Sequence, residues 1–490
     1  MKRHLPILAI LFAATAARIY YAGLFELSLD EPYYWLWSLY PQLSYYDHPP
    51  MVAYFIYAAG LLGDSERFIR LPAILCMTGV TAFSYAIASG VANSMRVGIW
   101  AALLTLAIPM FSVGGLITTP DSPLLLFWSA ALYCGYRAID TQKPRWFYAT
   151  GLCYGLAMLS KYTAVFFGPA FLIFLMASPE NRHWLFRWTP YLAFILGMAV
   201  FSPVVYWNYT HDWASFKFQF SHGMDPVVDN LRMAAEFWGG QVALYGLFLF
   251  FFIVAASVGI GKLGLRGRRD DYLYLSLMSA PVLLFFVINS LRARMEGNWS
   301  AMAYVAAVIA APIFYARMRE RGAGWKKDWL FRGFAASVAV SALLIIYAHI
   351  QIVDPILPMP QKREISRRIY GWKVLGEESA RLLKPMGSGA FMLTGRYQIS
   401  SLLGYYAPGR PEAYMMAGEG RFGYLGSVDH LKGKNVLYVE ETGRVDLNAI
   451  KGYFRKVEPA GVLRIERHGE LIREFSFYRC YNYKGGLVKI

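Results

Sequence analysis

Long apolar runs separated by short polar segments dominate the first 350 residues of the chain. A helix needs about 20 apolar residues to cross a bilayer. Eleven membrane helices are predicted, at residues 5–24, 67–91, 97–116, 121–139, 146–160, 163–178, 187–206, 237–259, 272–290, 299–316 and 330–350. The fifth and sixth are short for a crossing. The pattern predicts a polytopic α-helical membrane protein with about 11 transmembrane helices.

The cations support this assignment because they fall in alternate loops, as the positive-inside rule requires. With the N-terminus in the cytoplasm, the inside loops hold Lys2, Arg3, Arg96, Arg137, Lys143, Arg145, Arg182, Arg187, Lys262, Arg266, Arg268, Arg269, Arg317, Arg319, Arg321, Lys326 and Lys327. Joining 146–178 into one helix would move Arg182 and Arg187 outside, so two short segments are retained. Eleven helices place the C-terminus outside, which in a bacterial inner membrane is the periplasm.

Composition agrees with a membrane protein and narrows the choice of partners. Hydrophobic residues make up 57% of the chain and charged residues 16%, whereas soluble domains have about 25% charged residues. The formal net charge of +16 does not indicate nucleic acid, because the cations lie mainly in short loops between apolar runs. Four cysteines show neither metal-site spacing nor a disulfide framework.

From about residue 355 the apolar runs become short and charges frequent. Residues 365–383 have helical periodicity, and strands are predicted at 391–393, 436–439, 462–465 and 471–478. The predicted domains are therefore a catalytic membrane domain, 1–354, and a small extracytoplasmic α/β domain, 355–490. Within the first, an outer loop at 25–66 is expected to form helices lying at the membrane interface.

This outer loop carries adjacent carboxylates, Asp30 and Glu31, followed by Pro32 and several aromatic residues. Charge this close to lipid is costly and usually functional. Sugar transfer to a hydroxyl or phosphate oxygen needs a general base, and a carboxylate can serve. We predict that Asp30 and Glu31 are catalytic. In the other interpretation, Asp30 caps the following helix, with Pro32 in its first turn.

A second motif in the loop is Asp47-His48-Pro49-Pro50. Asp47 and His48 are candidates to bind a divalent metal ion, or His48 to contact a donor phosphate. A simple turn before the two prolines is the alternative. His222, in a later outer segment, is a tentative further metal ligand, although a lone loop histidine is more often solvated. A divalent metal ion is therefore the cofactor to test.

Three outside cations are candidates to hold a phosphate: Lys161, Arg292 and Arg294. Lys161 lies where the two short helices meet, and a snorkelling lysine is the alternative. The two arginines can equally contact anionic lipid headgroups. Asp121, at the start of the fourth helix, is interpreted as a helix cap.

Aromatic residues make up 17% of the chain, and many belong to the belt at a membrane interface. Outer aromatics such as Tyr33 and Tyr46 can instead contact the faces of a sugar. The sequence does not separate these two uses.

Several motifs together resemble the bacterial branch of the protein O-mannosyltransferase-like family, membrane glycosyltransferases of the GT-C fold to which the lipid A aminoarabinose transferase is related. They are Leu29-Asp30-Glu31-Pro32-Tyr33-Tyr34-Trp35, Tyr46-Asp47-His48-Pro49-Pro50, Arg70-Leu71-Pro72-Ala73, Thr119-Pro120-Asp121-Ser122-Pro123, Gly155–Lys161, Gly297-Asn298-Trp299-Ser300-Ala301 and Arg396-Tyr397-Gln398. The last motif resembles C-terminal domains of this branch and makes Arg396 a substrate-binding candidate.

The resemblance implies an inverting transfer from a polyprenyl-phosphate sugar on the outer face of the inner membrane, with Asp30 as base. In the aminoarabinose transferase a Glu-Lys pair stands where this chain has Asp47-His48, with the acidic member near a metal and the lysine on donor phosphate. Histidine at this position shifts the phosphate contact toward Lys161 or an arginine.

The predicted protein is thus a polyprenyl-phosphate-sugar-dependent glycosyltransferase of the cell envelope. Its expected partners are the lipid-linked donor, membrane lipids and an envelope acceptor, which is lipid A or core, a protein hydroxyl or a glycan. A transporter or flippase of lipid-linked sugars is the alternative, and it would place ionisable residues at the bilayer midplane. A catalytically inactive scaffold is a third possibility. The clustering of charge on one face favours the enzyme.

Overall fold

The computed structural model describes residues 4–224, 230–320, 325–356, 365–416, 420–425 and 428–487. Contacts divide the chain into two compact units. Unit 1 comprises Met1–Tyr20, His48–Val52 and Arg70–His349, and unit 2 comprises Tyr21–Asp47, Ala53–Ile69 and Ile350–Ile490. Unit 2 therefore combines most of the first outer loop with the C-terminal segment. The predicted domain boundary at residue 354 stays a prediction.

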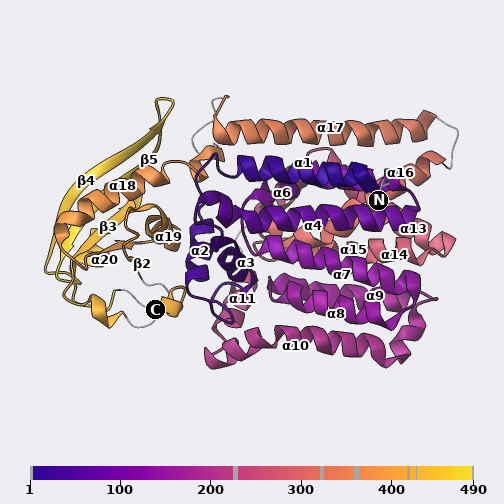
Figure 1. Ribbon diagram of the computed structural model, residues 1–490, viewed down its shortest axis with the longest axis horizontal. Helices are drawn as coiled ribbons and strands as arrows, with labels where there is room; N and C mark the ends of the chain where they lie inside the picture. The colour runs from indigo at the N-terminus through magenta and orange to yellow at the C-terminus, as the bar shows by residue number, and fades with distance from the viewer. Residues whose placement is uncertain are drawn as a thin grey trace. The chain divides into compact units, whose positions relative to one another are not determined.

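Unit 1 is a bundle of helices, several of which run side by side in Figure 1. The helices that belong wholly or mainly to this unit are α1 (Leu5–Tyr21), α4 (Glu66–Ala92), α5 (Met95–Leu106), α6 (Pro109–Ser112), α7 (Asp121–Thr141), α8 (Pro144–Met158), α9 (Phe167–Ala177), α10 (Trp188–Thr210), α11 (Ala214–Met224), α12 (Asn230–Tyr245), α13 (Leu249–Gly267), α14 (Asp270–Leu277), α15 (Ala280–Ser290), α16 (Ala301–Glu320) and α17 (Trp325–Val353). Helix α8 packs between α7 and α10.

Membrane-spanning character is clearest in six described segments, judged by length and composition. They are Glu66–Ala92, Trp188–Thr210, Leu249–Gly267, Asp270–Ser290, Gly297–Glu320 and Asp328–Val353. A bent pair, Met95–Leu106 with Pro109–Leu116, makes a seventh if it counts as one span. Shorter apolar helices cover Leu5–Tyr21 and Tyr162–Ala177. The helical membrane architecture is confirmed, and the number of eleven crossings stays a prediction.

Two predicted helices are interrupted in the structure. The predicted helix at 237–259 is wrong in its bounds, because α12 ends at Tyr245 and α13 begins at Leu249. Gly246 adopts a φ of +92° between them, a conformation that ends a helix and that glycine tolerates best. The predicted helix at 97–116 bends by 78° before Pro109, which lacks the N–H that a continuous helix would use.

Small residues let the helices of unit 1 approach closely. Helix α16 is almost entirely buried and carries many alanines. Between α8 and α10, a Cβ placed on Gly151 would collide with the backbone oxygen of Ala193, and one on Gly155 would lie 2.5 Å from that of Gly197. Close backbone approach of this kind is typical of helix packing in membranes.

Unit 2 contains a five-stranded sheet with strand order β2-β1-β3-β5-β4. Its strands are β1 (Phe391–Thr394), β2 (Ala413–Met415), β3 (Val436–Glu441), β4 (Lys456–Arg467) and β5 (Glu470–Tyr481). Strands β2, β1 and β3 are parallel, whereas β5 pairs antiparallel with β3 and β4. The four strand predictions fall within β1, β3, β4 and β5. Strand β2 was not predicted, and its three residues give too short a pattern to recognise.

Both faces of this sheet are covered, because successive side chains of a strand point to opposite faces. Met392 and Leu437 belong to a core cluster that also includes residues of α18 (Trp372–Leu383) and α19 (Tyr397–Tyr406). Phe391 and Val436, their neighbours along the strands, belong to the core of the other face. The sheet therefore gives α19 a fixed position.

Helix α19 connects the sheet to the outer-loop segment of unit 2. It packs against α2 (Glu31–Leu39), with the Trp35 and Tyr405 rings in edge contact at 5.0 Å. The Leu27 N–H donates to the Tyr406 hydroxyl at 2.7 Å. The loop predicted to lie at the membrane interface is thus folded against the C-terminal sheet structure, which brings the acidic motif to α19.

Candidate active site

Asp30 directly precedes α2, where the sequence motif offers both a base and a helix cap. Its side chain makes no capping hydrogen bond to the described backbone. Instead, the Tyr397 hydroxyl, at the start of α19, donates to Asp30 Oδ1 at 3.1 Å. The described contacts therefore give Asp30 tertiary partners from the C-terminal segment, because the side chain of Gln398, next to Tyr397, also hydrogen-bonds to its carboxylate.

The surroundings of Asp30 raise the pKa of its carboxyl group above the ordinary value. Burial is the largest cause, since a low-polarity environment disfavours the charged form. The hydrogen bond from Tyr397 and the charge of Arg368 lower the pKa, and the nearby Asp47 carboxylate raises it. A carboxylate with a raised pKa is a stronger base, which suits proton abstraction near neutral pH.

Asp47, the acidic residue of the second motif, is buried next to the tyrosine rings that surround Asp30. The Tyr33 hydroxyl donates to Asp47 Oδ2 at 2.6 Å, and Arg421 Nη2 lies 3.3 Å from Oδ1. The Tyr33 and Tyr397 rings are in contact, with centroids 4.6 Å apart. We call the group Asp30, Tyr33, Asp47, Tyr397 and Arg421 the acidic cluster. All of its members belong to unit 2.

Arg421 stabilises the acidic cluster by charge and by stacking. Its guanidinium lies 5.2 Å from the centroid of the Tyr397 ring and 5.5 Å from that of Tyr46. Burial lowers the pKa of Arg421, but Asp47 and the nearby tyrosines outweigh this effect and raise it overall. Tyr46, predicted as a sugar-binding aromatic, thus lies beside the cluster and contacts a cation.

Glu31 and Arg396 have described partners that occupy them structurally. Glu31 is fully buried, and its Oε2 accepts a hydrogen bond from the Ser28 N–H at 2.8 Å, which holds the turn before α2. Arg396 Nη2 donates to Glu441 Oε2 at 3.1 Å. Their predicted catalytic and substrate-binding roles stay predictions.

Unit 1 contains a second polar centre, which unites three of the sequence motifs. Lys161 Nζ donates to Asp121 Oδ1 at 2.8 Å, and Asn298 Nδ2 donates to Asp121 Oδ2 at 2.7 Å. The Lys161 and Asp121 side chains are only 6% and 7% exposed. Lys161 is therefore a buried ion-pair partner and does not snorkel. Asp121 begins α7, but interpreting it as a simple cap misses these two contacts.

The other predicted site residues of unit 1 differ in their exposure to solvent. Arg292 and Arg294 are exposed, and Arg294 Nε lies 3.2 Å from Glu296 Oε1. His48 is half-buried. The His222 side chain lies outside the described residues. In the described part of the chain, no three His, Cys, Asp or Glu side chains group as metal ligands, so the divalent metal stays a prediction.

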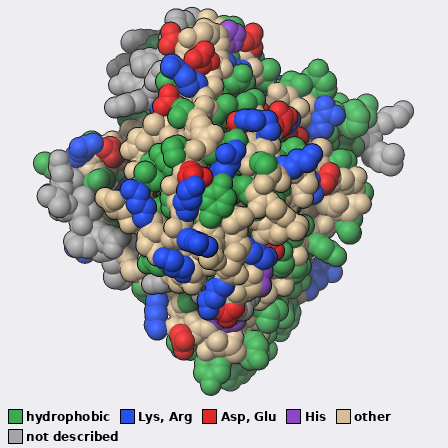
Figure 2. Space-filling view, turned by 90° about the vertical axis from the view of Figure 1, so that its left-hand side faces the viewer, with side chains coloured by type: hydrophobic (Ala, Val, Ile, Leu, Met, Phe, Trp, Pro, Cys, Tyr) green, Lys and Arg blue, Asp and Glu red, His purple; other side chains and the backbone are tan. Residues whose placement is uncertain are grey.

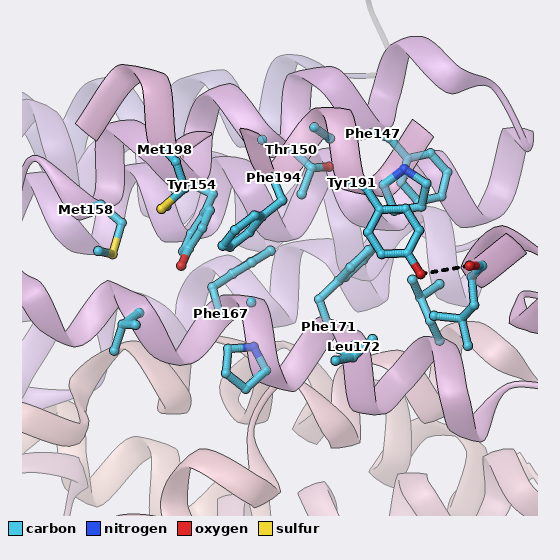
Figure 3. Close-up of a pocket in the computed structure, with 18 residues that line it drawn as sticks. Phe147, Thr150, Tyr154, Met158, Phe167, Phe171, Leu172, Tyr191, Phe194 and Met198 are labelled. Atoms are coloured by element: carbon cyan, nitrogen blue, oxygen red, sulfur yellow. Dashed lines mark hydrogen bonds between the residues drawn. The ribbon is translucent and has the colours of Figure 1, made fainter. Parts of the chain in front are cut away.

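An apolar cavity of about 520 Å³ lies among α8, α9 and α10. Figure 3 shows the rings of Tyr154 and Phe194 on one side of it and those of Phe167 and Phe171 on the other. The Tyr191 hydroxyl is satisfied by the Leu185 carbonyl at 2.8 Å. Such a lining favours a hydrocarbon chain over a polar ligand.

The acidic cluster includes two residues that the sequence analysis did not select individually, Tyr397 and Arg421. Tyr397 could have been selected from the sequence, because it lies in the Arg396-Tyr397-Gln398 motif. Arg421 carries no such signal. Asn298 also lay in a recognised motif, and its contact with Asp121 explains why that motif is polar.

Comparisons with known proteins give consistent matches of three kinds: a family, a curated relative and solved structures. Residues 47–207 match the family described as dolichyl-phosphate-mannose-protein mannosyltransferase. The chain is 26% identical over 381 residues to the lipid A galacturonosyltransferase RgtD of Rhizobium johnstonii, covering 76% of each chain. ArnT from Cupriavidus metallidurans has a similar fold at 15% identity. Its apo crystal structure gives a TM-score of 0.66, with 97% of this chain and 98% of ArnT covered.

The crystal structure of ArnT bound to undecaprenyl phosphate gives a TM-score of 0.64, with 96% of this chain and 98% of ArnT covered. These matches confirm the resemblance recognised from the motifs, and the ArnT structures show that the chain has the same fold as ArnT.

Proposed function

We propose that this chain, a relative of RgtD and of the mannosyltransferase family, transfers a sugar from a polyprenyl-phosphate donor to lipid A. The observation that carries the proposal is the half-buried Asp30 carboxylate, to which Tyr397 donates a hydrogen bond and whose pKa is raised. A base of this kind is what activation of an acceptor oxygen needs. The name of RgtD favours lipid A over a protein hydroxyl or another envelope glycan.

In the proposed reaction, Asp30 accepts the proton of the acceptor hydroxyl. The acceptor oxygen attacks the anomeric carbon from the face opposite the phosphate, so the new glycosidic bond forms with inversion. The bond between the anomeric carbon and the phosphate oxygen breaks, and its electron pair leaves with the polyprenyl phosphate. Phosphate departs as an anion, so this step needs no general acid.

We also propose that the chain crosses the bacterial inner membrane eleven times and that the acidic cluster faces the periplasm. The charge distribution along the loops supports this orientation. Labelling of single cysteines introduced at Asp64 and Arg268 with a membrane-impermeant thiol reagent tests it, after replacement of the native cysteines. Labelling in intact cells is expected at position 64 and not at position 268.

The proposed function is tested by supplying polyprenyl-phosphate sugars to membrane vesicles that contain the protein. Lipids and proteins are then scanned for the added mass of one sugar. A modified lipid A supports the proposal, whereas a modified protein or glycan would replace the acceptor. Donor movement across the bilayer without any product would support the transporter or flippase instead.

The expected divalent metal has limited support in the cluster. Each carboxylate oxygen of Asp47 already has a partner, Tyr33 on Oδ2 and Arg421 on Oδ1, and the positive charge of Arg421 opposes a cation at the same carboxylate. We therefore derive no step through a metal. If a metal ion at Asp47 is required, EDTA treatment of the vesicles will abolish transfer and Mg²⁺ or Mn²⁺ will restore it. Unchanged transfer after EDTA treatment is the outcome expected from these contacts.

Replacing Tyr397 by phenylalanine is expected to move the acidic limb of the pH profile of kcat/KM toward higher pH. In the wild-type protein, the hydrogen bond from Tyr397 lowers the pKa of Asp30. Its loss in the variant therefore raises that pKa further. Asp30 then needs a higher pH to be ionised, so the acidic limb moves to higher pH. Tyr405→Phe is the matched control on α19, since its hydroxyl donates to the Asp64 carbonyl. A limb that stays in place in Tyr397→Phe would contradict the assignment.

The apolar cavity is proposed to hold part of the polyprenyl chain. A Cβ at Gly168 would meet Tyr154 at 3.5 Å, an ordinary contact, so Gly168→Leu should fill the cavity without moving the backbone. The expected result is a KM for long-chain donors raised several-fold, with little change for a donor with a two-isoprene tail. Gly239→Leu is the control, because its Cβ would meet nothing within 4 Å. Equal effects on both donors would contradict a tail site.

A further inference from the structure

A group of arginines surrounds two adjacent carboxylates at the end of β3 in unit 2. Glu441 Oε2 accepts a hydrogen bond from Arg396 Nη2 at 3.1 Å and lies 3.4 Å from Arg444 Nε. Arg473 Nε, from β5, lies 3.5 Å from Glu441 Oε1. Glu440 accepts a hydrogen bond from the Gly395 N–H at 2.9 Å and lies 3.7 Å from Arg396 Nε. Glu441 alone thus serves three arginines.

The hydrogen-bonding capacity of these arginines exceeds what the two carboxylates supply. The Arg473 side chain is 5% exposed, and its guanidinium stacks 4.1 Å from the centroid of the Trp372 ring. Its Nη1 is buried without a hydrogen-bond partner among the described residues, as is Arg396 Nε. A buried charged donor without an acceptor is costly. Both atoms are donors, so the acceptor that each lacks is an anion or another oxygen.

Electrostatics indicate the same excess of positive charge. The pKa of Arg473 is lowered to about 9, mainly by burial, and Glu441 only partly offsets this. The charges of Arg367, Arg396 and Arg368 each lower it further. Figure 2 shows several Lys and Arg side chains, with Asp and Glu among them, on the face that lies at the left of Figure 1.

Two of these arginines, Arg396 and Arg473, and the nearby Arg368 lie close in sequence or in space to residues that contact the proposed base, Asp30. Arg396 immediately precedes Tyr397, whose hydroxyl donates to Asp30. Arg368 lies beside Arg473, because the Arg368 carbonyl accepts a hydrogen bond at 3.2 Å from the indole N–H of Trp372, the ring on which Arg473 stacks. The charge of Arg368 also lowers the pKa of both Asp30 and Arg473. An anion bound by these arginines would therefore lie near the carboxylate that is proposed to accept the acceptor's proton.

We propose that Arg368, Arg396 and Arg473 form a subsite for a phosphate group carried by one of the two substrates. Arginine suits this ligand because its planar guanidinium binds phosphate oxygens in pairs. The phosphate comes either from the polyprenyl-phosphate donor or from a phosphorylated acceptor lipid. The proposal rests on the proposed function for its substrates and names a subsite that the acidic cluster does not supply.

The test measures kcat and KM for donor and acceptor separately, using the full chain in nanodiscs. Arg368→Gln changes an exposed residue and should leave folding intact, and Arg473→Lys retains the buried charge but loses the paired donors. Both are expected to raise KM at least tenfold for the substrate whose phosphate binds, with a smaller change in kcat. The affected substrate identifies the source. Arg381→Gln is the control, an exposed arginine of α18 paired with Glu378.

Direct binding separates this proposal from the proposed function. Calorimetry with undecaprenyl phosphate, and with lipid A before and after enzymatic removal of its phosphates, needs no turnover. Weakened binding of one phosphate-bearing probe by both variants supports the subsite, even if no sugar transfer is found. Binding and KM within twofold of the wild-type values for every probe, in variants that remain folded, would overturn it.

Discussion

Asp30→Asn is expected to lower the rate of sugar transfer by about a hundredfold to ten-thousandfold, the range over which a general base contributes. Asparagine has nearly the same shape and can still accept the hydrogen bond from Tyr397, but it cannot take up the acceptor's proton. The fold should survive, because burial already disfavours the charge of Asp30. The measurement is kcat/KM in vesicles, together with the unfolding temperature of the purified variant.

Asp64→Asn is the matched control for this variant. Asp64 lies in the same outer loop, but its side chain is 69% exposed and pairs with Arg410 at the surface. Its loss should change transfer by less than twofold. A variant Asp30→Asn that keeps a tenth or more of wild-type activity would assign the base to another residue, with Glu31 and Asp47 as the next to replace.

The elements of the fold were largely predictable because their signals are local. Short, continuous apolar runs identified strands β1 and β3, and longer apolar runs located most helices of unit 1 within a few residues. The prediction failed where the apolar pattern continues through a break, as at Gly246, since leucine and phenylalanine follow the glycine. Periodicity records which residues avoid water and does not record a change of backbone direction.

The candidate site was predictable only in part, because its contacts join distant segments. The motif identified Asp30, but its partner Tyr397 lies 367 residues away in the sequence. No spacing rule relates the two, and only the packing of α19 between the sheet and α2 brings them together. Arg421 lies in a segment without a recognisable pattern. The arginine group at Glu441 is likewise assembled from residues before α19, after β3 and within β5.

Asp121→Ala is expected to destabilise the folded protein by about 3–5 kcal/mol, the usual effect of removing one partner of a buried ion pair. The Lys161 ammonium would remain buried, and the Asn298 amide would lose its acceptor. The measurement is the free energy of unfolding in detergent micelles. Glu236→Ala is the control, because Glu236 pairs with Arg232 on the surface, where a pair contributes about 0–1 kcal/mol.

A double variant distinguishes a buried charge from a simple loss of packing at this centre. In Asp121→Leu with Lys161→Met, neither charge is left inside the unit, so most of the stability lost in Asp121→Ala should return. If activity stays low in this stable double variant, Lys161 or Asp121 also acts on substrate. If Asp121→Ala unfolds no more easily than Glu236→Ala, the pair contributes little, and the three motifs that meet there need an explanation in binding.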